Sequence, residues 1–233
     1  MNTLLLSLGA IVVTLLSYLI SKKIYEYKRI IIFSPIVFAP VIIIILLSFG
    51  DMTYETYKKG SNLLSYMLGP ATVAFAIPMY KHFQLLKKHS IEILVSVLSG
   101  TMIATLSSLF LALLFHLNGQ IVNSIIPRSI TIPIAVDVSE SIGGDPSVTI
   151  LFVIMTGIWG TMIGPKLIRL LTLRSSVAKG LLMGVAAHGT GTARAFELGK
   201  LEGTFSSLAM IITAILTLVF AHTIIPALFN MLS

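Results

Sequence analysis

The 233-residue sequence contains no cysteine and few charged residues. Without cysteine, the chain forms neither a disulfide, a thiolate nucleophile nor a cysteine-ligated metal site. Asp, Glu, Lys and Arg make up 11% of the chain, whereas a soluble domain carries about 25% because its surface must face water. Hydrophobic residues make up 56%. This composition excludes an ordinary soluble domain and predicts an integral membrane protein.

Catalytic and cofactor motifs are lacking as well. The run GTGTARA at 189–195 has neither the glycine spacing nor the preceding strand of a dinucleotide site. No nucleophile elbow is present, and no pair of histidines and carboxylates has the spacing of a zinc site. We therefore expect no enzyme, no cofactor and no metal.

Apolar residues form long blocks instead, and about 20 such residues cross a hydrocarbon core. The blocks cover residues 4–20, 30–48, 62–80, 91–115, 147–165 and 205–232. The first block lacks the basic start and cleavage site of a signal peptide, and Lys22 and Lys23 follow it directly, so we interpret it as a retained span. The predicted fold is all-α: a polytopic helical protein with about six to eight hydrophobic segments, in one membrane domain over 1–233.

Most of the sixteen Lys and Arg residues lie in three short segments, at 22–29, 81–88 and 166–179. Basic residues beside membrane spans mark the cytoplasmic side. We therefore expect a multi-pass protein of the cell membrane, specifically a bacterial plasma membrane, with both termini and a loop at 49–61 outside. The net charge of +7 suits the anionic headgroups of the bilayer. No basic face with interleaved aromatics exists, so nucleic acid is not an expected partner.

Segment 120–145 conflicts with this topology if it crosses the membrane fully. Pro127 and Pro133 interrupt its apolar run, and Arg128, Asp137 and Glu140 are costly where they face lipid. Irregular backbone at membrane depth is tolerated only where protein or a water-filled cavity covers it. We predict a re-entrant segment that enters and leaves on the outer side.

Segment 180–203 has the same character, because Gly189 and Gly191 weaken a helix where a span would carry leucine. If it turns back, it does so from the cytoplasmic side. Two interrupted segments that enter from opposite faces mark a transporter site, so we consider an inverted repeat. Full spans with unwound centres are the alternative. A third interruption, at Pro70 and Pro78, is expected to line the same cavity.

The candidate substrate-binding residues lie in the two interrupted segments. They are Arg128, Thr131, His188, Thr190, Gly191, Thr192 and Arg194. A guanidinium binds a carboxylate bidentately, and amides at a broken helix attract anions. Hydroxyl groups on the threonines add donors, although threonines in helices also bond the backbone one turn earlier.

Charged neighbours leave alternatives open for both arginines and for the histidine. Arg128 is a substrate contact, or it pairs with Asp137 or Glu140, which then act as gating or charge partners. Arg194 contacts an anion, or it forms a salt bridge with Glu197 three residues along the helix. His188 titrates near neutral pH and carries a coupling proton, or it is a structural hydrogen-bonding residue.

Small residues recur at helical spacing on two segments, at Gly157, Gly160 and Gly164 and at Gly180 and Gly184. This spacing permits close helix packing. The contacts it serves are intramolecular, or belong to a homo-oligomer, or are made with a small partner protein. We expect a homo-oligomer.

Three motifs also carry a family resemblance. They are LGPATVAFAIPMYK at 68–81, IPRSITIPIAVDVSESIGG at 126–144 and AHGTGTARAFELGKLEGTFSSLAM at 187–210. In this order, and in a chain of this length, they resemble the LrgB/CidB family, the larger membrane subunit of bacterial holin/antiholin-like pairs. The resemblance covers the whole chain.

The resemblance implies one of two functions. Bacterial members modulate murein hydrolase activity and cell lysis together with a small LrgA/CidA-type membrane partner. Related systems, including the plastid glycolate/glycerate translocator, carry small carboxylates. Because the interrupted segments also point to an anion, we expect a transporter or facilitator for monocarboxylates such as pyruvate or glycolate. The holin/antiholin-like regulator of lysis is the alternative.

Overall fold

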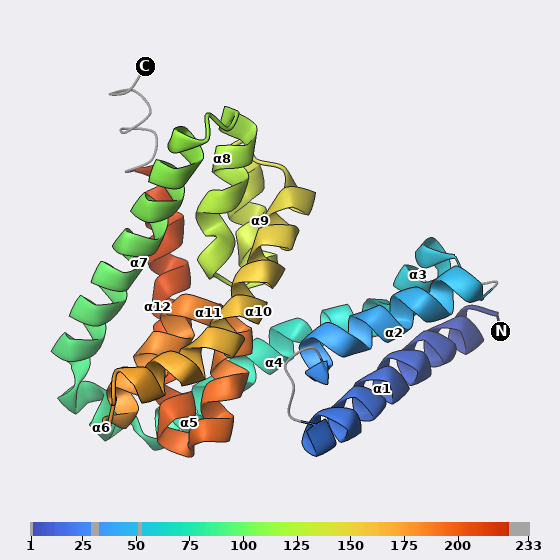
Figure 1. Cartoon of the computed structure of the whole chain (residues 1–233), viewed down its shortest axis with the longest axis horizontal. Helices are drawn as coiled ribbons and strands as arrows, with labels where there is room; N and C mark the ends of the chain where they lie inside the picture. Colours follow the sequence, from blue (N-terminus) through green and yellow to red (C-terminus); the bar gives the residue numbers. More distant parts are fainter. Residues whose placement is uncertain (1, 29–32, 51–52, 224–233) are drawn as a thin grey trace. The chain divides into compact units, whose positions relative to one another are not determined.

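The computed structural model describes residues 2–28, 33–50 and 53–223 (Figure 1). These residues are almost entirely helical, and no strand occurs among them. They form two compact units, which divide between Ala74 and Phe75. The single membrane domain expected over 1–233 stays a prediction.

In its described part, the first unit contains four helices: α1 (Asn2–Lys28), α2 (Pro35–Phe49), α3 (Tyr54–Tyr66) and α4 (Leu68–Ala74). α1 packs against both α2 and α3, and the hydroxyls of Thr14 and Tyr57 join α1 to α3 at 2.7 Å. The prediction of a loop over 49–61 is wrong beyond residue 53, where a helix begins. Thr53 caps a new helix there, because its Oγ1 accepts a hydrogen bond from the Thr56 amide at 3.3 Å.

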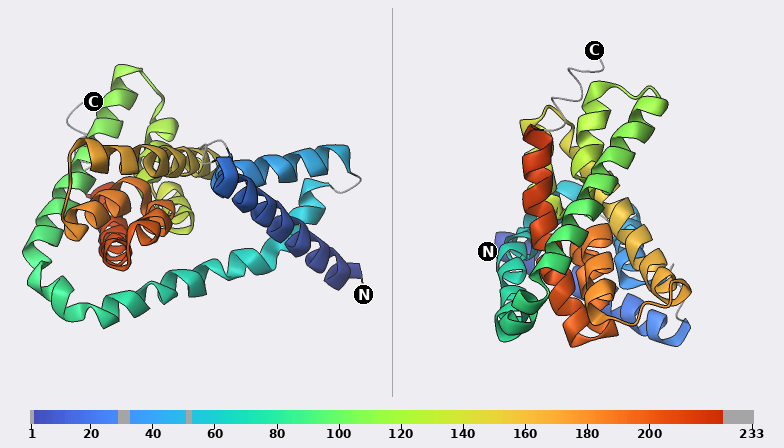
Figure 2. Two further views of the ribbon diagram at one scale, coloured as in Figure 1. Left: turned by 60° about the horizontal axis from the view of Figure 1, so that its bottom comes forward. Right: turned by 90° about the vertical axis from the view of Figure 1, so that its left-hand side faces the viewer.

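The second unit holds the interrupted segments. Its elements are α5 (Ala76–Lys81), α6 (Phe83–Lys88), α7 (Ser90–Leu114), α8 (Gly119–Ile125), the 3-10 helix η2 (Ile126–Ser129), α9 (Ile132–Ser141), α10 (Pro146–Leu170), α11 (Ser176–Leu198) and α12 (Lys200–His222). α7 and α12 pack against each other along the unit, as the green and red helices of Figure 2 show.

Among the described residues, five helical stretches are long and apolar enough to cross a membrane: Ser7–Lys28, Tyr54–Lys81, Ser90–Leu114, Pro146–Leu170 and Lys200–His222. The all-α polytopic prediction is therefore confirmed. The interruption at Pro70 and Pro78 is also present, since short helices α4 and α5 break at Phe75. These prolines belong to different units, so their place beside a common cavity stays a prediction.

Residues 119–141 form a hairpin of two short helices, hairpin 1, with its tip at η2. The chain after the second leg lies against the first leg, because Asn123 Nδ2 donates to the Ile142 carbonyl at 2.6 Å and Ser124 Oγ accepts from the Asp145 amide at 2.7 Å. Pro127 breaks the first leg, and Pro133 opens the second leg, where a missing N–H costs nothing. The chain therefore leaves this segment at the end where it entered, as predicted.

Residues 176–198 form hairpin 2, which the structure bends within α11 at Ala187 and His188. A Cβ on Gly191 would collide with the Met183 carbonyl, so the second leg lies directly against the first. Ser176 Oγ donates to Glu202 Oε1 at 2.9 Å, which ties the start of the hairpin to the start of α12. This segment is re-entrant too.

The two hairpins enter the second unit from opposite ends (Figure 1). At the open end of hairpin 1, Ser141 Oγ lies 3.1 Å from Nε2 of His222, the last residue of α12. Hairpin 2 opens where α12 begins, and the His89 ring at the start of α7 packs edge-on against Phe205 there. Each hairpin is followed by a long helix, α10 or α12. This arrangement is the inverted repeat that the sequence led us to consider.

Basic residues mark one end of this unit. Lys81, Lys87, Lys88, Lys166, Arg169, Arg174 and Lys179 all lie near the open end of hairpin 2, in or beside the short helices and the loop between α10 and α11. By the positive-inside rule, hairpin 2 enters from the cytoplasm and hairpin 1 from outside. The described part of α12 then ends at the outer side, in agreement with the topology drawn from the sequence.

Candidate functional site

The tips of the two hairpins meet inside the second unit. A Cβ built on Gly189 would lie 3.7 Å from Thr131 Cγ2 and 3.8 Å from Met210 Sδ of α12. The His188 ring, 5% exposed, places Nε2 3.1 Å from the Val153 carbonyl of α10. The two interrupted segments that the sequence singled out, far apart in the chain, are therefore brought together.

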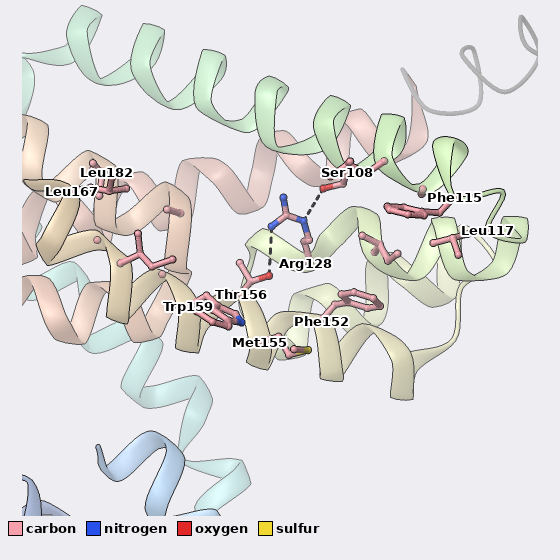
Figure 3. A pocket seen from close by; sticks show the side chains of 17 residues that line it. Ser108, Phe115, Leu117, Arg128, Phe152, Met155, Thr156, Trp159, Leu167 and Leu182 are labelled. Atoms are coloured by element: carbon pink, nitrogen blue, oxygen red, sulfur yellow. Dashed lines mark hydrogen bonds between the residues drawn. The ribbon is translucent and has the colours of Figure 1, made fainter. Parts of the chain in front are cut away.

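Arg128 extends from the tip of hairpin 1 into the space between α7 and α10 (Figure 3). Its Nε donates to Ser108 Oγ at 2.7 Å, Nη1 to Thr156 Oγ1 at 3.5 Å and Nη2 to the Ala104 carbonyl at 3.5 Å. Of its five N–H groups, these bonds use three. One N–H on each terminal nitrogen is left for a further acceptor, which is the number that a bidentate carboxylate takes.

Pairing of Arg128 with Asp137 or Glu140 is not observed. Both carboxylates are exposed on α9, which leads away from the tip toward the outer end. The ion pairs within the described ranges join His89 to Glu92, Lys179 to Glu202 and Arg194 to Glu197. Pairing was one of the two alternatives that the sequence left open for Arg128, and the turn at η2 separates the arginine from α9. A gating role for Asp137 and Glu140 stays a prediction.

Around Arg128 lies a largely apolar pocket of about 600 Å³. Its walls come from α7, α10, α11 and hairpin 1, and its described lining residues are Ser108, Leu111, Ala112, Phe115, Leu117, Ile125, Arg128, Phe152, Met155, Thr156, Trp159, Gly160, Ile163, Gly164, Leu167, Leu182 and Ala186. Arg128 alone carries a charge among them. The pocket therefore combines one positive group, two hydroxyls and a broad hydrophobic surface.

Broken helices also direct their dipoles toward the tips. Thr131 is the residue before α9, so the amides at the start of this ten-residue helix point toward the middle of the unit. The second leg of hairpin 2 begins after His188, beside the tip of hairpin 1, and runs in the opposite direction to α9. N-terminal helix ends carry partial positive charge and favour an anion.

The threonines of hairpin 2 bond the backbone rather than the pocket. Thr190 Oγ1 donates to the Ala187 carbonyl at 2.8 Å, and Thr192 Oγ1 to the His188 carbonyl at 2.9 Å. Thr192 also lies 3.0 Å from Ser206 Oγ of α12. These contacts are the structural alternative that the sequence left open, and neither threonine lines the pocket.

Arg194 lies on the second leg of hairpin 2, away from Arg128. It forms the predicted salt bridge with Glu197 and does not line the pocket. The sequence grouped the two arginines, whereas the structure separates them, because the tip of hairpin 2 is at His188 and Arg194 is six residues farther along.

Ser108 and Thr156, the partners of Arg128, were missed by the sequence reasoning. Each is a hydroxyl residue inside a long apolar helix, Ser108 near the end of α7 and Thr156 near the middle of α10. A hydroxyl inside a span is the signal that could have identified them, although Ser and Thr are also common where membrane helices simply pack.

The glycines at helical spacing serve contacts within the chain. Cβ atoms on Gly160 and Gly164 would collide with Ala187 and Met183 of hairpin 2. A Cβ on Gly184 would likewise collide with the Ser206 carbonyl of α12. These glycines therefore let the long helices approach hairpin 2 closely.

Comparison with known proteins agrees with the motifs. The LrgB-like family model matches residues 14–227. The chain is 47% identical to Uncharacterized protein YwbG of Bacillus subtilis, over 88% of this chain and 91% of that protein. It is 34% identical to Holin-like protein CidB of Staphylococcus epidermidis, over 97% of this chain and 98% of that protein. It is 33% identical to Antiholin-like protein LrgB of Bacillus cereus, over 93% of this chain and 94% of that protein. No solved structure matches. The chain is a multi-pass cell-membrane protein that belongs to the LrgB-like family.

Proposed function

We propose that this protein moves a small monocarboxylate across the membrane, with the carboxylate bound to Arg128. The observation that carries the proposal is a cation at the tip of a re-entrant hairpin, held by neutral groups and facing a pocket. A charge inside a membrane protein is costly without a counter-charge and usually serves function. A carboxylate solute supplies that counter-charge.

The pocket supports a small organic solute. Its volume of about 600 Å³ falls within the range of about 300–1,000 Å³ typical of small-molecule sites. The two N–H groups left on Arg128 hold the carboxylate, and apolar walls suit a short carbon chain such as that of pyruvate. Two hairpins that enter from opposite sides are the arrangement in which many transporters place their solute.

The names of the relatives, holin-like and antiholin-like, favour a second function. The family resemblance implies that this function is regulation of cell lysis together with a small LrgA/CidA-type membrane partner. One structural feature supports it as well. Met155, Trp159 and Ile163 follow one face of α10 along the pocket, and each is at least 42% exposed. A partner helix can cover such an apolar face. In this function Arg128 is dispensable and the apolar face is not.

Uptake of labelled pyruvate or glycolate into proteoliposomes, with and without the small partner, tests the first function. Arg128→Gln is expected to reduce uptake at least about tenfold, because a charge-assisted hydrogen bond contributes about 1.5–3 kcal/mol. Arg194→Gln is the matched control, since a surface ion pair contributes about 0–1 kcal/mol. The transport proposal fails if the wild-type protein moves neither acid under both conditions.

Co-purification of the small partner tests the second function. Met155→Trp and Ile163→Trp enlarge the apolar face and are expected to release the partner, while Arg128→Gln retains it. Ile215→Trp on α12, 58% exposed and outside the pocket, serves as the control. Retention of the partner by both tryptophan variants on α10 would exclude this face as its contact.

A further inference from the structure

Two threonines of α12, Thr213 and Thr217, are buried in an unusual way. Their side chains are 0% and 1% exposed, and neither Oγ1 has a hydrogen-bond partner among the described residues. They are one turn apart on the same face of the helix. No other side-chain oxygen or nitrogen of the described chain is buried in this state.

Other hydroxyls of the same helix provide an internal comparison. Thr204 donates to the Lys200 carbonyl and Ser207 to the Gly203 carbonyl, both at 2.8 Å, and Thr223 donates to the Val219 carbonyl at 2.7 Å. This bond to the preceding turn is available to any helical threonine. Thr213 and Thr217 do not make it, so each hydroxyl oxygen is available to a ligand.

The position of the pair links it to the hairpin tips. Met210, which lies beside Gly189 at the tip of hairpin 2, is three residues before Thr213. Ala214, the next residue, belongs to the core cluster that includes Val122, Ile126 and Ile130 of hairpin 1. Thr213 is therefore on the part of α12 that passes both tips, and Thr217 is one turn nearer the outer end.

The hairpin tips also bring helix C-terminal ends, which suit a cation, to this level. α8 of hairpin 1 and the first leg of hairpin 2 both run from an end of the unit toward its middle, so their carbonyl ends point inward. C-terminal helix ends carry partial negative charge, and such ends bind Na⁺ in transporters with broken helices. Hydroxyl oxygens are suitable additional ligands for a hard cation.

We infer that Thr213 and Thr217, with the inward carbonyl ends of the hairpins, bind an alkali-metal cation, in the first place Na⁺. This site is separate from Arg128, which faces α7 and α10. Its role as a coupling site rests on the proposed function. A carboxylate that crosses together with one Na⁺ moves no net charge, so the membrane potential does not oppose its uptake.

Thermal unfolding of the purified full chain in detergent tests the site without any transport assay. NaCl, KCl and choline chloride are compared at equal ionic strength. A ligand that binds only the folded state raises the melting temperature. We expect Na⁺ to raise it for the wild type and for Thr213→Ser/Thr217→Ser, which keeps both hydroxyls, but not for Thr213→Val/Thr217→Val.

The valine variant also separates binding from misfolding. Valine has the shape of threonine and removes two unpartnered hydroxyls, so in choline chloride this variant should unfold at the wild-type temperature or above. Thr101→Val on α7 is the control, because that buried hydroxyl already donates to the Val97 carbonyl at 2.7 Å. It should keep the response to Na⁺.

The two proposals fail separately. If neither Na⁺ nor K⁺ shifts the wild-type melting temperature beyond choline, or if the valine variant responds as the wild type does, the threonines hold only water and the cation site is excluded. If the Na⁺ shift is present but no carboxylate is taken up, the site stands and its coupling role falls with the transport function.

Discussion

Thr131 and Gly189 face each other where the two hairpin tips meet, with 3.7 Å between the threonine methyl carbon and the position of a Cβ on the glycine. One residue belongs to a segment that enters from outside and the other to a segment that enters from the cytoplasm. Their contact means that the middle of the second unit is built from loop-like backbone on both sides. Such backbone is tolerated at membrane depth because protein covers it.

Removal of the Ser108 hydroxyl should weaken solute binding more than removal of the Thr156 hydroxyl. Ser108 accepts from Arg128 Nε at 2.7 Å, whereas the bond to Thr156 is 3.5 Å long. In Ser108→Ala the guanidinium loses a bond worth about 1.5–3 kcal/mol, so we expect the KM for carboxylate uptake to rise about ten- to a hundredfold. Thr156→Val should raise it less. The reverse order would show that Ser108 does not position Arg128.

Glycine should be tolerated better than alanine at His188. The His188 backbone has φ 41° and ψ −131°, a region that glycine adopts freely and that other residues enter at a cost of about 1–3 kcal/mol. Both substitutions lose the bond to the Val153 carbonyl, but only His188→Gly relieves the strain. We expect this variant to unfold at a higher temperature than His188→Ala. In an ordinary helix alanine is the more stable of the two, so that order would contradict the bend.

Alanine at Gly191 should destabilise hairpin 2, and alanine at Gly189 should not. A Cβ on Gly191 meets the Met183 carbonyl and lies 2.7 Å from Ala187 Cβ, while the nearest atoms to a Cβ on Gly189 are at 3.7 and 3.8 Å. Overpacking of this kind costs about 1–3 kcal/mol. Thermal unfolding of Gly191→Ala, with Gly189→Ala as its matched control, measures the difference. Equal stability of the two variants would argue against close packing of the hairpin legs.

Accessibility of single cysteines can test the two re-entrant hairpins, because the natural sequence contributes no background thiol. Asn118→Cys and Glu140→Cys lie at the two ends of hairpin 1, and Ser175→Cys and Lys200→Cys at the two ends of hairpin 2. All four positions are exposed. An impermeant maleimide added to intact cells should label the first pair and reach the second only after permeabilisation.

If the two positions of one pair are labelled from opposite sides, that segment crosses the membrane fully and is not a hairpin. If both pairs are labelled from outside, both hairpins enter from the same side and the repeat is not inverted. The experiment thus separates the path of each segment from its sidedness.

Backbone breaks could be predicted from the sequence because proline and glycine act locally. Pro127 and Pro133 mark the tip of hairpin 1 within a few residues, and Gly189 directly follows the bend of hairpin 2. The exact site of that bend could not be predicted. The positive φ falls on His188, whereas local preference alone would assign it to the glycine beside it.

The surroundings of Arg128 depend on tertiary packing, which local patterns do not encode. Ser108 and Thr156 come from helices that lie 20 and 28 residues away in the sequence. From the sequence, pairing of Arg128 with Asp137 or Glu140 was an open alternative to substrate contact, and the 3-10 turn at the tip, which separates the arginine from α9, could not be foreseen. Arg194 and Glu197 pair as expected, since their contact is made within one helix.

The repeat of hairpin and long helix has a consequence for biogenesis. Hairpin 1 with α10 and hairpin 2 with α12 are two repeats of one arrangement, and they must enter the bilayer in opposite orientations. Four basic residues lie in or beside the short connection between α10 and α11: Lys166, Arg169, Arg174 and Lys179. This one basic cluster lies at the end of the first repeat, hairpin 1 with α10, and at the start of the second, hairpin 2 with α12. A single loop retained in the cytoplasm therefore orients both repeats as the chain is inserted.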